Sequence, residues 1–154
     1  FADEHGIETV SVRPFNVYGP RQSGESAIQR FVAQALRNQP LTITGDGTQI
    51  RAWCYITDFV DAMQRIMAAS FTGMEVFNVG NPRGTVTILE LAERIIALTR
   101  SSSRIEFREQ TGPDVEVRVP SIAKAQRLLG YEPKVGLDEG LTKTIEYFRS
   151  IQVV

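Results

Sequence analysis

Two short apolar segments that stop at turn-forming residues most strongly limit how this chain can fold. Residues 8–13 are rich in β-branched types and stop where Pro14 and Asn16 open a loop, which predicts a strand. Residues 76–79 have no room for a polar face, as a strand buried in a parallel sheet would show, and residues 80–82 stop them. Because strands that alternate with helices favour a parallel arrangement, we predict an α/β fold in which these two strands run parallel.

Helical spacing, capping patterns and short β-rich runs predict the other elements. Thr87 with Glu90 forms a capping-box pattern, and Thr57 and Asp58 are placed to cap another helix. The inward face of that second helix is expected to hold Phe59, Val60, Met63, Ile66 and Met67. The expected helices span residues 27–37, 57–69, 88–99, 121–130 and 138–150. The remaining expected strands span residues 41–44, 50–56, 105–108 and 115–119.

The composition indicates one globular domain and excludes several function classes. The 154 residues are 42% hydrophobic and 23% charged, which argues against a disordered chain. Lys and Arg total 17 against 18 Asp and Glu, so the net charge of -1 offers no basic excess to a nucleic acid. No apolar stretch approaches the ~20 residues of a membrane helix, so we expect no membrane contact. The single cysteine, Cys54, and the single histidine, His5, leave no internal disulfide and no cysteine-based or three-histidine metal site.

The first six residues carry an expectation about the chain as a whole. They contain no Met and no signal-peptide pattern, and residues 1–5 resemble the tail of a helix that Gly6 caps. We expect a piece of a longer cytoplasmic protein, with a start added by cloning as the alternative.

The strongest local signal of a site is the segment RPFNVYGPR at residues 13–21. It delivers an Asn, a Tyr and an Arg into a Gly- and Pro-containing loop at the carboxyl end of a predicted strand. Ligands bind at that edge of open α/β sheets. The alternative is a loop that needs Gly and Pro for its geometry, with Arg13 paired to a buried acid. The residues alone leave both interpretations open.

A second candidate is the segment GDGTQIRAWCYI at residues 45–56. A Gly-rich turn can cradle a phosphate with its backbone N–H groups, and Arg51 offers a planar fork of donors suited to a diphosphate. The alternative is a hairpin turn with a surface arginine beside a packed Trp53. The segment is neither a Walker loop nor a dinucleotide fingerprint, because the required Gly and Lys positions are absent.

A third candidate is the segment DVEVRVP at residues 114–120. Alternation along a strand places Asp114, Glu116 and Arg118 on one side, and a salt-bridged sheet face is the default interpretation. Arg118 would matter only if a cleft faces it. A nucleophilic site with a histidine base would need His5, close to the start of the chain, so we predict no catalytic residue here.

Four ordered segments together resemble the C-terminal half of the extended short-chain dehydrogenases: RPFNVYGPR, GDGTQIRAWCYITD, FNVGNP and DVEVRVPSIAKAQRLLGYEPKVGLDEGLTKTIEYF. These are the NAD-dependent epimerase/dehydratase family, which acts on nucleotide-diphosphate sugars. The resemblance runs from Thr9 to Phe148, and UDP-glucose 4-epimerases, UDP-glucuronate decarboxylases and dTDP-glucose dehydratases all carry close versions. The stretch DVEVRVPSI is similar to the bacterial UDP-glucuronic acid decarboxylases. The resemblance implies the C-terminal part of a Rossmann-type fold, with a short parallel sheet remnant and a small mixed α/β substrate-binding subdomain.

The resemblance also implies which residues bind the substrate. Asn16 matches an asparagine that hydrogen-bonds the substrate diphosphate, and Arg51 matches an arginine that clamps the same phosphates. Arg118 matches an arginine near the nucleotide and sugar end. Leu41 and Thr42 match a short strand whose backbone and side chains flank the base.

Pro14 and Phe15 match backbone that lies beside the nicotinamide in that family, yet two of the family's motifs are missing. The sequence has no Gly-rich dinucleotide fingerprint, and none of its tyrosines is followed four residues later by a lysine. That pair moves a proton while hydride passes to the cofactor. The resemblance therefore implies NAD in the complete enzyme and no cofactor bound tightly by this chain.

We interpret residues 1–154 as the C-terminal nucleotide-sugar-binding portion of such an enzyme, with the N-terminal dinucleotide-binding half absent. The expected function is substrate binding within an NAD-dependent sugar-nucleotide epimerase, dehydratase or decarboxylase, with no activity alone. The alternative is a stand-alone binding or interaction module from a truncated gene. The expected partner is a nucleotide-diphosphate sugar, and we also expect a non-native or swapped homo-oligomer through the exposed sheet edge.

Overall fold

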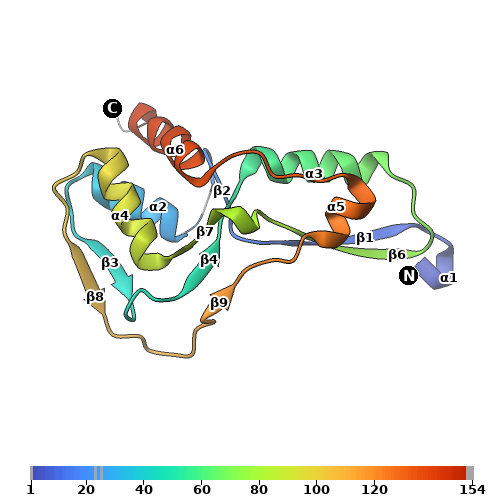
Figure 1. Ribbon diagram of the computed structural model, residues 1–154, viewed down its shortest axis with the longest axis horizontal. Coiled ribbons are helices and arrows are strands. Elements are labelled where there is room, and N and C mark those ends of the chain that lie inside the picture. Colours follow the sequence, from blue (N-terminus) through green and yellow to red (C-terminus); the bar gives the residue numbers. More distant parts are fainter. Residues whose placement is uncertain (1, 23, 25, 152–154) are drawn as a thin grey trace.

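The computed structural model describes residues 2–22, 24 and 26–151, in which helices and short strands alternate along an elongated molecule (Figure 1). The helices are α1 (Ala2–His5), α2 (Ala27–Leu36), α3 (Ile56–Ala68), α4 (Ile88–Thr99), α5 (Ala123–Leu129) and α6 (Leu137–Ile151), with a 3₁₀ turn at Pro82–Gly84. The strands are β1 (Thr9–Pro14), β2 (Val17–Tyr18), β3 (Leu41–Thr44), β4 (Ile50–Ala52), β5 (Cys54–Tyr55), β6 (Met74–Val79), β7 (Thr85–Thr87), β8 (Ile105–Arg108) and β9 (Val117–Arg118). No helix of these residues is long and apolar enough to cross a membrane.

β1 and β6 form a parallel pair that runs in register from Thr9 opposite Met74 to Pro14 opposite Val79. The prediction of an α/β fold with these two strands parallel is therefore confirmed. Three further small sheets link distant segments: β2 runs parallel to β5, β3 parallel to β8, and β4 lies between antiparallel β7 and parallel β9. In Figure 1, β1 and β6 extend towards one end of the molecule and β3 and β8 towards the other, with β4 between them.

Two separate apolar cores stabilise the two ends of the molecule. The larger lies among α2, α4, α6 and β3, and it includes Phe31, Leu91 and Ile145. The smaller lies between β6 and the helices α3 and α5, and it includes Phe77 and Tyr131. Figure 1 shows α3 and α5 over the β1–β6 pair, and α2, α4 and α6 gathered at the other end. The candidate site lies near β4, where the two ends meet.

The predicted capping box at the start of α4 is confirmed. Thr87 Oγ1 accepts the Glu90 N–H at 3.1 Å, and Glu90 Oε2 accepts the Thr87 N–H at 2.8 Å. Both partners lie within one turn of helix, so the pattern needs no help from distant residues. These hydrogen bonds also lower the pKa of Glu90.

The prediction that Thr57 and Asp58 cap α3 is wrong. α3 begins one residue before them, at Ile56, and its N-cap makes no side-chain capping bond. Asp58 is buried in the first turn instead, where its carboxylate accepts the backbone N–H groups of Lys134 at 3.0 Å and Val135 at 3.1 Å. A carboxylate that satisfies two backbone donors of a distant loop is unavailable to its own helix end.

The prediction that Val60 and Met67 face inward is also wrong. Their side chains are 45% and 74% exposed, whereas Ala62 and Ile66 of the same helix are buried against the smaller core. Phe59 and Met63 are partly buried against the same core, as expected, so helical spacing overestimates the width of the buried face only at Val60 and Met67.

Two expected strands are shorter than the sequence suggests. The expected strand 50–56 breaks at Trp53 into β4 and β5, and Ile56 already belongs to α3. Of the expected strand 115–119, only Val117 and Arg118 pair, because their partner β4 is itself three residues long.

β1 has one open edge within the part of the chain that the structure describes, and we expect copies of the protein to associate through it. Thr9 and Phe15 donate their N–H groups towards β6. Because backbone N–H groups alternate in direction along a strand, Pro14, which has none, occupies a position whose N–H would point to the open edge. Light scattering at high concentration is expected to show oligomers that Ser11→Lys weakens, since a twofold edge pairing brings two lysines together near mid-strand. A monodisperse monomer of the unmodified protein would contradict this.

Candidate functional site

The candidate site is centred on β4, and the two strands that pair with β4 come from distant parts of the chain. Arg51 pairs in register with Val86 on antiparallel β7 and with Arg118 on parallel β9. Side chains alternate along extended backbone, so Gln49, Arg51 and Trp53 share one face of this segment. Three chemically different side chains are thereby placed in one row.

The Gly-rich turn before β4 positions the strand and already uses part of its hydrogen-bonding capacity. Gly45 and Gly47 have φ angles of 77° and 80°, a conformation that favours glycine. The Gly45 N–H donates to the Arg108 carbonyl at 2.9 Å, and the Thr48 N–H and hydroxyl both donate to Asp46. These two bonds lower the pKa of Asp46. A phosphate cradle in this turn would have to displace such contacts.

A cavity of about 200 Å³ opens beside β4 and joins residues from separate segments. Asn16 follows β1 and Arg51 lies on β4, and the structure brings both to the wall of this cavity. Trp53 and Ile88 add apolar surface to the wall. The polar and charged residues that line it are Asn16, Arg30, Thr44, Gln49, Arg51 and Asp114.

The Arg51 guanidinium is held in place by four hydrogen bonds within the protein. Nη2 donates to both carboxylate oxygens of Asp114, at 3.0 and 3.1 Å. Nη1 donates to the carbonyls of Ile50 at 3.0 Å and Glu116 at 3.3 Å. Arg51 is only 8% exposed, so this is a buried cation, and it meets the carboxylate through one nitrogen, Nη2. A guanidinium can also bind phosphate oxygens in pairs through two of its nitrogens.

Asn16 is anchored to the same strand. Its φ of 40° is left-handed, a region that asparagine tolerates better than most residues. Its Nδ2 donates to the Ala52 carbonyl at 2.9 Å, and its own carbonyl accepts the Cys54 N–H at 3.2 Å. The loop after β1 is therefore fixed against β4 and β5, and Asn16 keeps a defined position at the cavity.

Arg118 lies beside Arg51 but does not line the cavity. Residues paired across neighbouring strands point to the same face, so register places the two arginines side by side. Arg118 is exposed, and within the described ranges its side chain makes no hydrogen bond or ion pair. Alternation along residues 114–120 predicts a salt-bridged face, and the structure shows that Asp114 pairs with Arg51 of β4.

Leu41 and Thr42 differ sharply in what they can offer a ligand. Leu41 is fully buried in the larger core, and its N–H donates to the Arg104 carbonyl. The open side of Thr42 is covered by α2: its N–H donates to Gln34 Oε1 at 3.2 Å and its Oγ1 accepts from Gln34 Nε2 at 2.7 Å. A base that reads the Thr42 backbone would have to displace the Gln34 amide.

Pro14 and Phe15 lie at the carboxyl end of the β1–β6 pair. Pro14 is exposed, and the Phe15 N–H donates to the Val79 carbonyl at 2.9 Å. A Cβ on Gly80 would lie 2.9 Å from Phe15 Cβ and 2.8 Å from Pro120 Cγ, so the backbone here is tightly packed. Neither residue lines the cavity beside β4.

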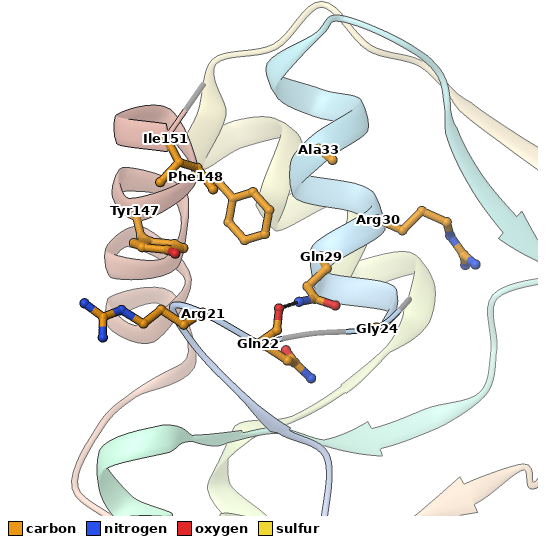
Figure 2. A pocket seen from close by; sticks show the side chains of 9 residues that line it. All are labelled: Arg21, Gln22, Gly24, Gln29, Arg30, Ala33, Tyr147, Phe148 and Ile151. Atoms are coloured by element: carbon orange, nitrogen blue, oxygen red, sulfur yellow. Dashed lines mark hydrogen bonds between the residues drawn. The ribbon is translucent and has the colours of Figure 1, made fainter. Parts of the chain in front are cut away.

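A larger cavity of about 580 Å³ lies between α2 and the end of α6, and of its lining only Arg21 belongs to a segment that the sequence singled out. Figure 2 shows Tyr147 and Phe148 projecting from α6 on one side and Gln29 from α2 on the other. The guanidinium groups of Arg21 and Arg30 point outward at opposite ends of this view. The lining therefore lacks converging charges, and its signal in the sequence is the ordinary apolar stripe of α6.

Burial favours the protonated forms of two tyrosines and of the cysteine. Burial raises the pKa of Tyr18 and of Tyr131 above the usual tyrosine value, and it raises the pKa of the Cys54 thiol to about 11. No three metal-ligating side chains gather among the described residues. The cavity beside β4 offers side-chain amides, the Arg51 guanidinium and the Asp114 carboxylate that pairs with it.

Known proteins resemble this chain over nearly its whole length. The family model described as "NAD dependent epimerase/dehydratase family" matches residues 1–80. UDP-glucuronic acid decarboxylase 5 of Arabidopsis thaliana is 45% identical over 148 residues, which are 95% of this chain and 42% of the relative. UDP-glucuronic acid decarboxylase 1 of Danio rerio is 39% identical over 150 residues, 96% of this chain and 35% of the relative. The chain thus spans less than half the length of these curated relatives.

Solved structures give the same result for the fold. A UDP-glucose 4-epimerase with UDP-glucose from Thermotoga maritima superposes with a TM-score of 0.92 at 35% identity, covering 98% of this chain and 49% of that one. A UDP-glucuronic acid 4-epimerase from Bacillus cereus in complex with UDP-glucuronic acid and NAD superposes with a TM-score of 0.91 at 31% identity, covering 97% and 48%. The cavity beside β4 is therefore built on a backbone that enzymes of UDP-sugars share.

Proposed function

The chain belongs to the NAD-dependent epimerase/dehydratase family, and from this membership we propose that it binds the nucleoside-diphosphate part of a UDP-sugar in the cavity beside β4. Asn16 and Arg51 would contact the phosphates there, and Arg118 would add positive charge at the rim. The whole enzyme would be a UDP-sugar epimerase or decarboxylase, with this chain as its substrate-binding portion. The decarboxylases among the relatives and the epimerases among the solved structures support both reactions equally.

The observation that carries this proposal is the convergence of Asn16 and Arg51 on one cavity wall. The two residues come from separate segments, and local geometry gives no reason for them to meet. Motif resemblance, which uses no structural information, implies that both contact the substrate diphosphate. An amide and a buried guanidinium around one cavity suit an anion with several acceptor oxygens.

NAD does not fit the residues present here as a site on its own. The sequence has no Gly-rich dinucleotide fingerprint for the cofactor's pyrophosphate, and the Phe15 N–H is already donated to the Val79 carbonyl. The tight contact of Phe15 and Pro120 with Gly80 leaves no cradle at this sheet edge. We therefore assign no hydride-transfer step to this chain and infer that it binds NAD weakly or not at all.

The contribution of this chain to the reaction would be positioning. A diphosphate held by a fixed guanidinium cannot slide or rotate freely, so the attached sugar is presented in one orientation. Binding energy from the distant nucleotide then lowers the entropy cost at the reacting carbon. The bonds from Arg51 Nη1 to the carbonyls of Ile50 and Glu116 would supply the rigidity that this role needs.

Calorimetric titration of the purified chain tests the proposal. We expect UDP to bind, uridine to bind much more weakly because it lacks the diphosphate, and NAD to give no saturable heat. We also expect no turnover of UDP-glucose or UDP-glucuronic acid when NAD is added. Turnover above background, or equal affinity for uridine and UDP, would contradict the proposed role.

A further inference from the structure

Gln49 and Trp53 flank Arg51 on the face of the β4 segment that lines the cavity, and each carries a buried polar atom without a partner. Gln49 is 9% exposed and Trp53 is 6% exposed. In the ranges that the structure describes, Gln49 Oε1 and Trp53 Nε1 make no hydrogen bond. Buried polar groups in folded proteins nearly always have a partner, so two such atoms beside one cavity need an explanation.

The orientation of the Gln49 amide is fixed by its other end. Nε2 donates to the Thr44 carbonyl at 3.3 Å and to Gln110 Oε1 at 3.4 Å. Exchanging the amide nitrogen and oxygen would place Oε1 against two acceptors, so the unpartnered atom is the carbonyl oxygen. The polar atom of Trp53 is unambiguous, because the indole has a single polar group and that group can only donate. Both residues line the cavity, so a buried, unused acceptor lies on one side of Arg51 and a buried, unused donor on the other.

The positions of these atoms match the order of groups in a nucleoside diphosphate. Residues two apart along extended backbone are separated by about 6.6 Å, so Gln49 and Trp53 lie to either side of Arg51 at a spacing that one ligand can bridge. Trp53 is on the side of Asn16, which bonds to Ala52, and Gln49 is on the side of Thr44 at the end of β3. Phosphate oxygens only accept hydrogen bonds, whereas ribose hydroxyls can donate.

We propose that Trp53 Nε1 donates to a phosphate oxygen and that Gln49 Oε1 accepts from a ribose hydroxyl of the nucleotide whose diphosphate Arg51 binds. This assignment rests on the proposed function and adds two contacts to it. Gln49 makes the site selective for a nucleoside diphosphate over inorganic pyrophosphate, and Trp53 strengthens the binding of both.

Trp53→Phe tests the donor because phenylalanine retains most of the packing and loses the N–H. We expect about a tenfold loss of affinity for both UDP and inorganic pyrophosphate, as for a hydrogen bond to a charged group. The melting temperature of the free protein should stay unchanged or rise, since an unpartnered buried donor has been removed. A role in packing alone would lower the melting temperature and leave affinity unchanged.

Gln49→Met tests the acceptor by comparing two ligands in the same variant. We expect UDP affinity to fall about tenfold and pyrophosphate affinity to stay within twofold, because pyrophosphate has no ribose hydroxyl. General damage to the site would weaken both ligands equally and would overturn the assignment of Gln49.

The matched control is Tyr131→Phe, which removes a buried hydroxyl that does have a partner and lies in the other core. Its hydroxyl donates to the Gly80 carbonyl at 3.1 Å, so we expect a lower melting temperature and unchanged binding. If the unmodified protein binds neither UDP nor pyrophosphate, the proposed function fails and this inference fails with it. If both bind and Arg51 matters, yet Trp53→Phe and Gln49→Met have no effect, only this inference is overturned.

Discussion

Arg51→Ala is expected to weaken UDP binding by tenfold or more, the largest loss that any single side chain of this cavity should produce. Arg51 is the buried cation of the wall, and its Nη2 already holds two oxygens of one carboxylate. A paired contact with phosphate contributes about 1.5–3 kcal/mol, and ~1.4 kcal/mol corresponds to one decade of affinity. Calorimetric or NMR titration of UDP into the two proteins measures the difference.

Two further variants separate this effect from general damage. Arg51→Lys keeps the charge and loses the planar fork, so its affinity should fall between those of the unmodified protein and the alanine variant. Arg65→Ala is the matched control, because Arg65 is also partly buried and bonds to Asp61 at 2.7 Å and to the Leu129 carbonyl at 3.1 Å, away from the cavity. Equal UDP affinity of the unmodified protein and Arg51→Ala would refute the assignment.

Features of the fold that depend on local signals were predictable from the sequence. The α4 capping box is formed by residues three apart, and the apolar stretch of β6 predicts a buried parallel strand without knowledge of its neighbours. Asp58 shows where such signals fail. Its residue type and its position in the sequence predict a helix cap, but its carboxylate instead binds two backbone N–H groups more than seventy residues away. Hydrogen bonds between such distant residues cannot be predicted from the spacing of residues within one segment.

The candidate site could be predicted from the sequence only in part, because it too depends on long-range contacts. Motif resemblance singled out Asn16 and Arg51, and the alternation along residues 114–120 indicated that Asp114 is salt-bridged. Asp114 and Arg51 are 63 residues apart and can pair only because β4 and β9 are neighbours. The sequence of neither segment predicts that the two strands pair. Gln49 and Trp53 were equally hidden, since an unpartnered buried atom is a property of the packed structure.

The contact between Asp114 and Arg51 leads to a second large effect, of opposite sign. A diphosphate that approaches Nη2 of Arg51 meets the Asp114 carboxylate already bound there. Ligand binding must therefore break this ion pair or share the guanidinium with it. Asp114→Asn removes the competing charge with little change of shape, so we expect inorganic pyrophosphate to bind about tenfold more tightly, a gain of ~1.4 kcal/mol.

The same substitution should destabilise the free protein, and the combination of the two changes identifies competition. Arg51 is buried and would lose its counterion, at a cost of about 1–3 kcal/mol, which is moderate because the Asp114 side chain is 45% exposed to solvent. Thermal unfolding and pyrophosphate calorimetry on one sample measure both changes. Asp138→Asn is the control, since Asp138 pairs with Arg94 on the surface and should alter neither by much. Tighter binding by a less stable protein means that Asp114 occupies the place of the phosphate. Weaker binding would mean instead that Asp114 orients Arg51 for the ligand, and the competition would be disproved.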